Sequence, residues 1–500
     1  MTVYIRRYLL AHGAYLAVVL ALLAWYGLDP GQALARFDGQ HYLQIANGGY
    51  PDKLSFLPDG KPARMNIAFF PLYPLLMSLL HVWGGLPMEV AGLLIALGAS
   101  LATAIGLGVL LEPLFGRRVA LTTVTIWAVG IDGIVQSMLY AQPLIAAFAV
   151  WGAIAVRRRR YLLAACCAIG AGLSHSTGLG LIVVVMVGSA LAIREAAHRR
   201  QWRAAIAPAA AFVLAPLGLL GFIGFLALRF HRLDAWFLAE SAPGWSSKFD
   251  FGKYTSQILI GQLDTSDWTA ANGLPHLVAT LWLLPAAACA LWLLRDTGWL
   301  PRLQRRVLPG SRVPSILTPA LSSDGGSALA LSSQPPGTSS PTPTPSPSPS
   351  PAVSPTQSTL SLPSPSALDL AETPSGTSSA TPSDSPSDFT SASASASASA
   401  PPSPSPSPAP DSRSTPLRPR PRVPWELSLF ALTTFAMILT DSGPWASKPR
   451  FILPCVALCI PPALWLERRS PRTRKVVLFA IAAVSAVCSY YLVGPSPSAL

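Results

Sequence analysis

Long apolar runs separated by short polar connectors make up most of the chain. Runs of membrane-spanning length, or nearly so, begin near Tyr8, Met88, Val119, Pro143, Tyr161, Leu179, Ala204, Leu274, Trp425, Phe451 and Val476. A helix needs about 20 predominantly apolar residues to cross a bilayer. The pattern therefore predicts an all-α polytopic membrane protein, a bundle of about eleven transmembrane helices.

The apolar run at residues 67–83 is a further candidate span, and the basic residues decide how it is interpreted. Lys and Arg are enriched in the cytoplasmic connectors of membrane proteins. With the N-terminus in the cytoplasm, all basic clusters lie inside if this run rests in the outer interface as a juxtamembrane helix. If the run spans instead, the clusters at 117–118 and 157–160 fall outside. We therefore predict an interfacial helix, and its prolines at 71 and 74 suit a helix start.

This topology places most polar segments on one side of the membrane. The outer side receives residues 37–83, 140–143, 174–178, 229–273 and 441–450. A transporter more often carries its polar groups near the bilayer midplane, on broken helices. Transport is therefore the least favoured of the functions considered below.

The chain is 51% hydrophobic, only 12% charged, and carries a formal net charge of +13. An excess of positive charge can indicate a nucleic-acid partner. Here the basic residues flank apolar runs, at Arg6 and Arg7, Arg117 and Arg118, Arg157 to Arg160, Arg199 to Arg203, Arg302 to Arg306, and Arg468 to Lys475. That distribution is typical of membrane topology, so we expect membrane lipids and no nucleic acid as partners.

A Pro/Ser-rich segment divides the chain into three parts. Residues 1–310 form a transmembrane module with an external loop at 29–87, and residues 423–500 form the C-terminal transmembrane helices. Between them, residues 311–422 contain runs such as PTPTPSPSPSP without apolar periodicity, which predicts disorder. The flanking basic clusters place this segment in the cytoplasm. A glycosylated stalk is the alternative and requires an outer position.

The N-terminus and the cysteines add little chemistry. Residues 33–35 (Ala-Leu-Ala) resemble a signal-peptidase site, but the apolar run of residues 8–28 is long enough to be a retained first helix. The six cysteines all lie within apolar runs and lack zinc-ligand spacing with histidine. We expect them to be small core residues without a disulfide framework.

The stretch from residue 37 to residue 74 is the first long polar insertion and holds the main catalytic candidate. A helix starting at Asp38 places this carboxylate on one face with His41, Tyr42 and Ile45. An acid at the membrane boundary can accept a proton from a sugar hydroxyl. The alternative is a helix N-cap, a common role for Asp. The sequence does not separate these two interpretations.

Basic residues on the outer side are the candidates for anion binding. Lys61, Arg64, Lys448 and Arg450 are there, and each suits a phosphate or a lipid headgroup. His175, in the sequence SHSTG, lies at an outer helix end, where a polar residue without chemistry is the alternative. The chain has no GxxxxGKS loop, so ATP is not indicated as an energy source.

Two further outer features have a functional and a structural interpretation each. Asp132 is an acid within an apolar region and so a functional candidate, but near a helix end it is equally explained by solvation. The aromatic residues of the loop after Arg229 suit sugar stacking, although an interfacial aromatic belt explains them without a function.

Several sequence blocks together resemble a known family. The blocks are FDGQHYLQIANGGYP, FFPLYPLL, LYAQPLIAAFAVWGA, GAGLSHSTGLGLIV, LDAWFLAESAPGWSSKFDF and KPRFILPC. They resemble the PIG-V type mannosyltransferases, membrane enzymes of the GT-C superfamily that are related to the second mannosyltransferase of GPI-anchor assembly and include bacterial members. The resemblance covers most of the chain except the Pro/Ser-rich segment.

The resemblance implies a reaction and its residues. The donor is polyprenyl-phosphate-mannose, the acceptor is lipid-linked or a cell-envelope glycan, and transfer takes place on the extracytoplasmic face. Asp38 occupies the place of the general base, and an outer basic residue such as Arg450 would hold the departing phosphate. Because phosphate is a good leaving group, no metal or other cofactor is expected. The candidate substrate-binding residues are His41, Tyr42, Arg64, Tyr73, Gln142, His175, Lys448 and Arg450.

Two positions depart from the family pattern. Gln142 stands where the family usually has Glu, which retains hydrogen bonding and removes the charge. His175-Ser176-Thr177-Gly178 replaces a frequent Arg-Pro-Thr-Gly. Both changes permit a second hypothesis, a non-catalytic family member that acts as a binding or assembly subunit.

Overall fold

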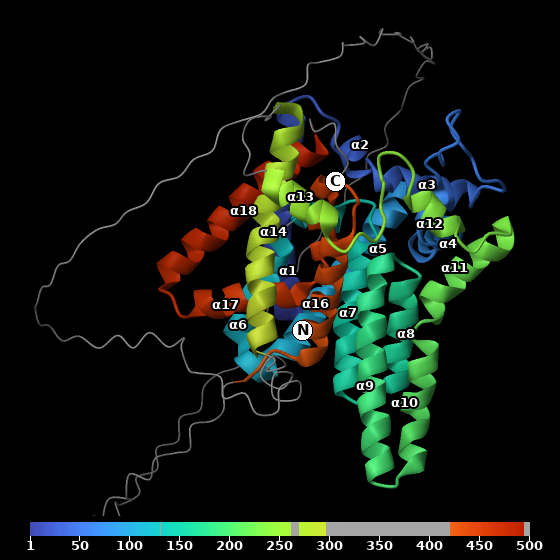
Figure 1. The fold of residues 1–500 in the computed structure, drawn as a ribbon. Coiled ribbons are helices and arrows are strands. Elements are labelled where there is room, and N and C mark those ends of the chain that lie inside the picture. Colours follow the sequence, from blue (N-terminus) through green and yellow to red (C-terminus); the bar gives the residue numbers. More distant parts are fainter. Residues whose placement is uncertain (131, 262–269, 297–420, 495–500) are drawn as a thin grey trace, which may run out of the picture. The chain divides into compact units, whose positions relative to one another are not determined.

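The computed structural model describes residues 1–130, 132–261, 270–296 and 421–494. These residues fold into helices, with no named β-strand among them and only two isolated bridges, Phe56–Pro62 and Phe249–Asp441. Figure 1 shows the helical arrangement. The predicted all-α class is confirmed for this part of the chain. The Pro/Ser-rich stretch up to residue 420 lies outside the described residues.

The first part of the chain alternates long helices with short ones. In order, the elements are α1 (Thr2–Trp25), α2 (Pro30–Leu34), α3 (Asp38–Gly48), η1 (Asn66–Ala68), α4 (Leu72–Gly84), α5 (Met88–Phe115), α6 (Arg117–Val129), η2 (Gly133–Ser137), α7 (Gln142–Arg157), α8 (Tyr161–Gly172), η3 (Ser176–Gly178) and α9 (Leu179–His198).

The rest of the described chain continues the same pattern. It comprises α10 (Trp202–Leu214), α11 (Leu217–Phe230), α12 (Ala235–Glu240), α13 (Lys253–Gly261), α14 (Ala270–Asp296), α16 (Trp425–Thr440), η5 (Trp445–Ile452), η6 (Val456–Cys459), α17 (Ile460–Glu467) and α18 (Pro471–Val493).

Each predicted apolar run coincides with a helix, but the helices differ in length. Among the described residues, six candidate spans are long and apolar enough to cross a membrane: Thr2–Trp25, Met88–Phe115, Ser176–His198, Trp202–Phe230, His276–Asp296 and Pro471–Val493. A seventh results if Trp445–Ile452 and Val456–Glu467, bent by 80°, form one span. The chain therefore has the helices of a multi-pass membrane protein, whereas a total of about eleven spans stays a prediction.

Shorter apolar helices account for the difference. Four of the eleven predicted runs lie on helices of 12 to 16 residues: Arg117–Val129, Gln142–Arg157, Tyr161–Gly172 and Trp425–Thr440. The run predicted to lie in the outer interface becomes α4, which has only 13 residues. A straight crossing needs about 20 residues, but α8, predicted to be a span, is as short, so the interfacial position of α4 stays a prediction.

Glycines allow the central helices to approach closely. A Cβ atom added at Gly106 of α5 would lie 2.6 Å from Val150 Cγ1 of α7, and one added at Gly152 of α7 would lie 2.8 Å from Leu181 of α9. Without a hydrophobic driving force between helices in lipid, such close contacts supply much of the association energy. The core of the bundle is thus built on small residues of α5, α7, α8 and α9.

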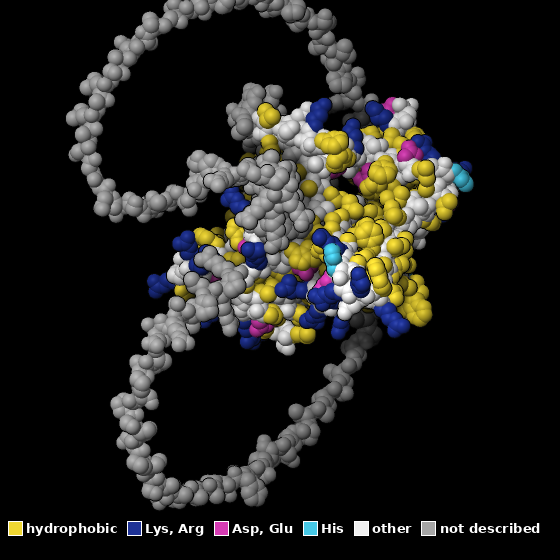
Figure 2. Space-filling model, turned by 60° about the horizontal axis from the view of Figure 1, so that its bottom comes forward, with side chains coloured by type: hydrophobic (Ala, Val, Ile, Leu, Met, Phe, Trp, Pro, Cys, Tyr) yellow, Lys and Arg dark blue, Asp and Glu magenta, His cyan; other side chains and the backbone are white. Residues whose placement is uncertain are grey.

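Large apolar side chains point outward from the candidate spans. Leu10 of α1 is 62% exposed, Ile206 of α10 is 66% exposed, and Phe479 of α18 is 76% exposed. Figure 2 shows a broad area of hydrophobic side chains, with Lys and Arg gathered in separate groups. Helices that are apolar on all sides, with exposed outer faces, are suited to hydrocarbon rather than to water.

Four short helices and one basic turn lie at opposite ends of the bundle. In Figure 1, α2, α3, α12 and α13 are near one end, and the turn between α9 and α10, with its basic residues, is at the other. The predicted outer segments therefore gather together. Which end faces the cytoplasm stays a prediction from the charge pattern.

Candidate functional site

A tight turn presents Asp38 at the start of α3. Phe37 has φ 58° and ψ −119°, and the Gly39 N–H donates to the Arg36 carbonyl over 3.2 Å. These are the features of a type II′ turn with Phe37 at its first central position, which glycine usually occupies. A non-glycine residue there costs roughly 1–3 kcal/mol of strain. Phe37 is the N-cap of α3, so the interpretation of Asp38 as the N-cap is wrong.

The Asp38 carboxylate forms a buried ion pair with Arg450 of η5. Asp38 Oδ2 lies 2.9 Å from Arg450 Nη1. The two residues are 6% and 9% exposed, respectively. Removing either partner from such a pair strands a charge in a poorly solvated place. The structure thus joins the predicted base to the arginine predicted to hold phosphate.

Aromatic rings surround the Arg450 guanidinium. Its central carbon lies 4.7 Å from the ring centroid of Phe451 and 5.5 Å from that of Tyr140. Arg450 Nη1 also donates to the Tyr140 hydroxyl over 3.4 Å. These contacts fix the plane of the guanidinium while leaving a positive charge beside Asp38.

Burial and charge act in opposite directions on Asp38. Burial raises the pKa of the Asp38 carboxyl above its usual range, and the positive charge of Arg450 opposes that shift without cancelling it. A raised pKa makes a carboxylate a stronger base near neutral pH. The environment of Asp38 therefore raises its proton affinity, and its role as a base stays a prediction.

His41 and Tyr42 lie on the same face of α3 as Asp38, as predicted. The His41 ring stacks on Phe69 at 4.6 Å between centroids, and its Nδ1 contacts Asn66 Oδ1 at 2.7 Å. Because an amide oxygen only accepts, Nδ1 carries the proton in this arrangement. His41 is partly exposed and lies close enough to stabilise the Asp38 charge.

Tyr42 and Tyr73 belong to the packed layer beneath the site. Tyr42 is 1% exposed and Tyr73 is fully buried, and their rings meet edge to face at 5.0 Å. The Tyr73 hydroxyl donates to the Gly92 carbonyl over 3.0 Å. The contacts of Tyr73 are thus with the helices that support α3.

Arg64 connects the loop before η1 with the loop after α12, and its contacts are not with the Asp38–Arg450 ion pair. Its Nε donates to the Pro243 carbonyl over 2.9 Å, and its guanidinium lies over the Trp245 ring at 5.9 Å. Trp245 in turn meets the His41 ring edge to face at 5.4 Å. Lys61 is exposed and pairs with Asp59 over 2.9 Å.

Lys448 is buried and bonds to the end of α16. Its Nζ donates to the carbonyls of Ile438 over 2.6 Å and Asp441 over 2.5 Å, and lies 3.4 Å from Thr255 Oγ1. An ammonium group has three N–H donors, so these acceptors match its full capacity. The structure therefore separates Lys448 from Arg450, although the two are close in sequence.

The His175 ring contacts Phe451, whose ring also lies beside the Arg450 guanidinium. Their rings lie 5.1 Å apart, and the Thr177 N–H donates to His175 Nδ1 over 3.2 Å. Burial and the nearby Arg450 charge lower the pKa of His175 to about 3, so its ring is neutral near pH 7.

Gln142 is buried at the start of α7. It is 1% exposed, and neither its amide nitrogen nor its amide oxygen has a hydrogen-bond partner among the described residues. A buried amide without partners is costly and therefore unusual. This position is two residues beyond Tyr140, whose hydroxyl contacts Arg450.

Glu240 is a second acid near the site that was not among the sequence candidates. Burial, followed by the charges of Asp441 and Asp38, raises the pKa of Glu240 to about 8. It ends α12, and the nearby Ser247 hydroxyl donates to Asp441 Oδ1 over 2.7 Å. The sequence signal that could have identified Glu240 is an acid within the aromatic stretch LDAWFLAES.

Asp132 also differs from its expected environment. It is 2% exposed, and its Oδ2 has no hydrogen-bond partner among the residues that the structure describes. The interpretation as a solvated residue is therefore wrong.

Comparisons with protein-family models, curated proteins and solved structures found no match. Within the described residues, no group of three or more His, Cys, Asp or Glu side chains has an arrangement suited to a metal ion. The site consists of a buried acid–arginine pair with aromatic walls, a neutral histidine, and a second acid.

Proposed function

We propose that this protein is a membrane glycosyltransferase that transfers mannose from polyprenyl-phosphate-mannose to a lipid-linked or cell-envelope acceptor on the extracytoplasmic face. The main observation behind this proposal is the buried ion pair in which Asp38 Oδ2 lies 2.9 Å from Arg450 Nη1. It supports the proposal because a carboxylate can accept a proton and a guanidinium can bind a phosphate, and these two side chains are in contact at one end of an apolar helical bundle. The resemblance of the sequence blocks supplies the sugar and its lipid carrier.

In this mechanism Asp38 accepts the proton of the acceptor hydroxyl while that oxygen attacks the anomeric carbon. The bond between the anomeric carbon and the phosphate oxygen breaks, and the phosphate leaves with the electron pair, which inverts the configuration. Arg450 stabilises the developing negative charge. The guanidinium has five N–H donors, enough to contact a phosphate and retain Asp38.

Replacing Asp38 with Asn tests the proposal. Asp38→Asn preserves the side-chain volume and removes the base, so we expect mannosyl transfer to fall by about 10² to 10⁴. Transfer from radiolabelled polyprenyl-phosphate-mannose is measured in membranes at equal protein abundance. Asp29→Asn is the matched control, because exposed Asp29 caps α2 in the same loop and Asn caps equally well.

Near wild-type transfer by Asp38→Asn would remove this residue from the mechanism. If wild-type membranes show no transfer, the non-catalytic binding or assembly subunit is favoured. The observation that supports this alternative is Gln142, where the PIG-V type enzymes usually have Glu. Solute uptake into vesicles would support a transporter.

A further inference from the structure

An arginine holds each end of α3, and the one at the start lies next to the proposed base. Arg36 Nη1 donates to the carbonyl of Val493 over 2.7 Å and to that of Gly494 over 2.5 Å. These carbonyls end α18, whose last turn has no basic residue of its own. Arg36 therefore satisfies acceptors that a helix C-terminus leaves open.

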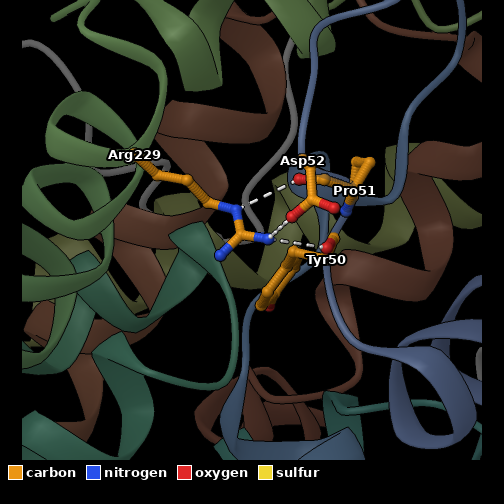
Figure 3. A network of polar contacts seen from close by, with 4 residues as sticks. All are labelled: Tyr50, Pro51, Asp52 and Arg229. Atoms are coloured by element: carbon orange, nitrogen blue, oxygen red, sulfur yellow. Dashed lines mark hydrogen bonds and ion pairs between the residues drawn. The ribbon is translucent and has the colours of Figure 1, made fainter.

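At the other end of α3, Arg229 of α11 makes a comparable set of contacts. Its Nε donates to the Pro51 carbonyl over 3.1 Å, and its Nη2 donates to the Tyr50 carbonyl over 3.1 Å and to Asp52 over 2.6 Å (Figure 3). Both arginines thus bind backbone carbonyls that adjoin helix ends. Only Arg36 is close in sequence to the acid.

Arg36 also contacts the turn that presents Asp38. Its carbonyl accepts the Gly39 N–H that closes the turn, and its guanidinium lies over the Phe37 ring at 4.8 Å. Phe37 holds a positive φ that a non-glycine residue leaves readily when unsupported. Rotation of this peptide would turn the Asp38 carboxylate away from Arg450.

We propose that Arg36 is a positioning residue for Asp38, coupling the C-terminal end of α18 to the strained turn at Phe37. The kinetic part of this inference rests on the proposed glycosyltransferase function. The structural part does not, because it concerns only the order of the turn.

The first test compares Arg36→Gln with the matched variant Arg229→Gln in purified full-length protein. Hydrogen exchange is followed at the amides of Gly39 and Gln40, which bond to Arg36 and Phe37. We expect Arg36→Gln to speed this exchange by about tenfold or more, and Arg229→Gln to affect only residues 50–52. Arg36→Lys should restore slow exchange in part, because an ammonium group can donate to the same carbonyls.

The second test separates positioning from general destabilisation. Phe37→Gly lets the turn form without strain, so it should recover most of the activity lost in Arg36→Gln. We expect Arg36→Gln alone to lower kcat by about tenfold or more with KM for the donor within about twofold. In the Phe37→Gly background the same change should lower kcat by less than about threefold.

Unchanged exchange at Gly39 and Gln40 in Arg36→Gln, or equal effects of Arg36→Gln and Arg229→Gln there, would overturn the inference. The inference would also be overturned if Arg36→Gln lowered kcat in the Phe37→Gly background by as much as it does in the wild-type background. If the wild-type protein shows no transfer, the proposed function fails, and the exchange comparison still decides whether Arg36 orders the turn.

Discussion

At the scale of single residues, the pairing of Asp38 with Arg450 determines what each group can do. The two oppositely charged groups are both buried and stabilise each other. Arg450 is the only one of the four outer basic candidates that meets Asp38 in the described structure. A phosphate that approaches Arg450 is thereby brought next to the proposed base.

The pair predicts a shift in the pH dependence of transfer. Arg450→Gln removes the charge that opposes the effect of burial, so the pKa of Asp38 should rise further. Because the ionised form is the base, the acidic limb of the kcat/KM profile should move to higher pH. Arg450→Lys keeps the charge and should leave the limb near its wild-type position. Arg229→Gln, which changes an arginine at the far end of α3, is the control.

An acidic limb that stays in place in Arg450→Gln would contradict the assignment. Loss of the arginine should also destabilise the fold, by about 3–5 kcal/mol for a broken buried pair. The profile is therefore recorded on the fraction that elutes as folded protein.

The sequence predicted Asp38 and its face of α3 but not the partner of Asp38. Helical spacing is local, whereas a contact between Asp38 and Arg450 joins opposite ends of the chain. From the sequence, Lys448 and Arg450 were both candidate substrate-binding residues, with Arg450 the example named for holding the phosphate. They point differently because η5 is a 3₁₀ helix, in which residues two apart are separated by about 120° around the axis.

At the scale of elements, the end of α16 depends on a side chain from η5. The last turn of α16 has no basic residue of its own, and Lys448 donates to the carbonyls of Ile438 and Asp441 there. A charged donor of this kind satisfies the open acceptors of a helix C-terminus. Lys448 thereby fixes the approach of η5, which carries Arg450.

Lys448→Met should accordingly act on stability. We expect a loss of about 1.5–3 kcal/mol, the usual contribution of hydrogen bonds to a charged group, with transfer by the folded fraction within about threefold of wild type. Thermal unfolding in detergent measures the first and membrane assays the second. Lys253→Met, at an exposed lysine, is the control. Lost transfer at unchanged stability would instead assign Lys448 to phosphate binding.

Element positions were more predictable than element shapes. Every long apolar run became helical, because burial in lipid or protein requires the backbone to bond internally. The run near Phe451 was expected to be one span and is bent by 80° instead. Pro449 lies inside η5, and Pro454 lies in the break between η5 and η6. Proline removes a backbone donor and breaks a helix, which accounts for the bend.

At the scale of the whole molecule, segments assigned to one side from charge alone come together. Arg450 contacts Tyr140, Phe70 contacts His175, and Trp245 contacts His41. Each contact joins two of the predicted outer segments. These contacts support the prediction that the segments lie on the same side of the membrane. That this side is the outer one is predicted from the charge distribution.

Thiol labelling on intact cells checks this sidedness. Phe251 is 86% exposed in the loop predicted outside, so Phe251→Cys should react with an impermeant thiol reagent. Ser340→Cys, in the segment predicted to be cytoplasmic, should react only after permeabilisation. The unmodified chain, with its own six cysteines, provides the background. Labelling of Ser340→Cys but not Phe251→Cys on intact cells would invert the map.

The separation of Asp38 and Arg450 along the chain has a consequence for biosynthesis. A ribosome adds roughly 5–20 residues per second, so Arg450 emerges about 20 to 80 seconds after Asp38. During that interval Asp38 lacks Arg450, and burial of an unpaired carboxylate in apolar surroundings is costly. The nascent chain therefore cannot close its site while earlier helices are still being inserted. Chains released before η5 should therefore lack the proposed transfer activity.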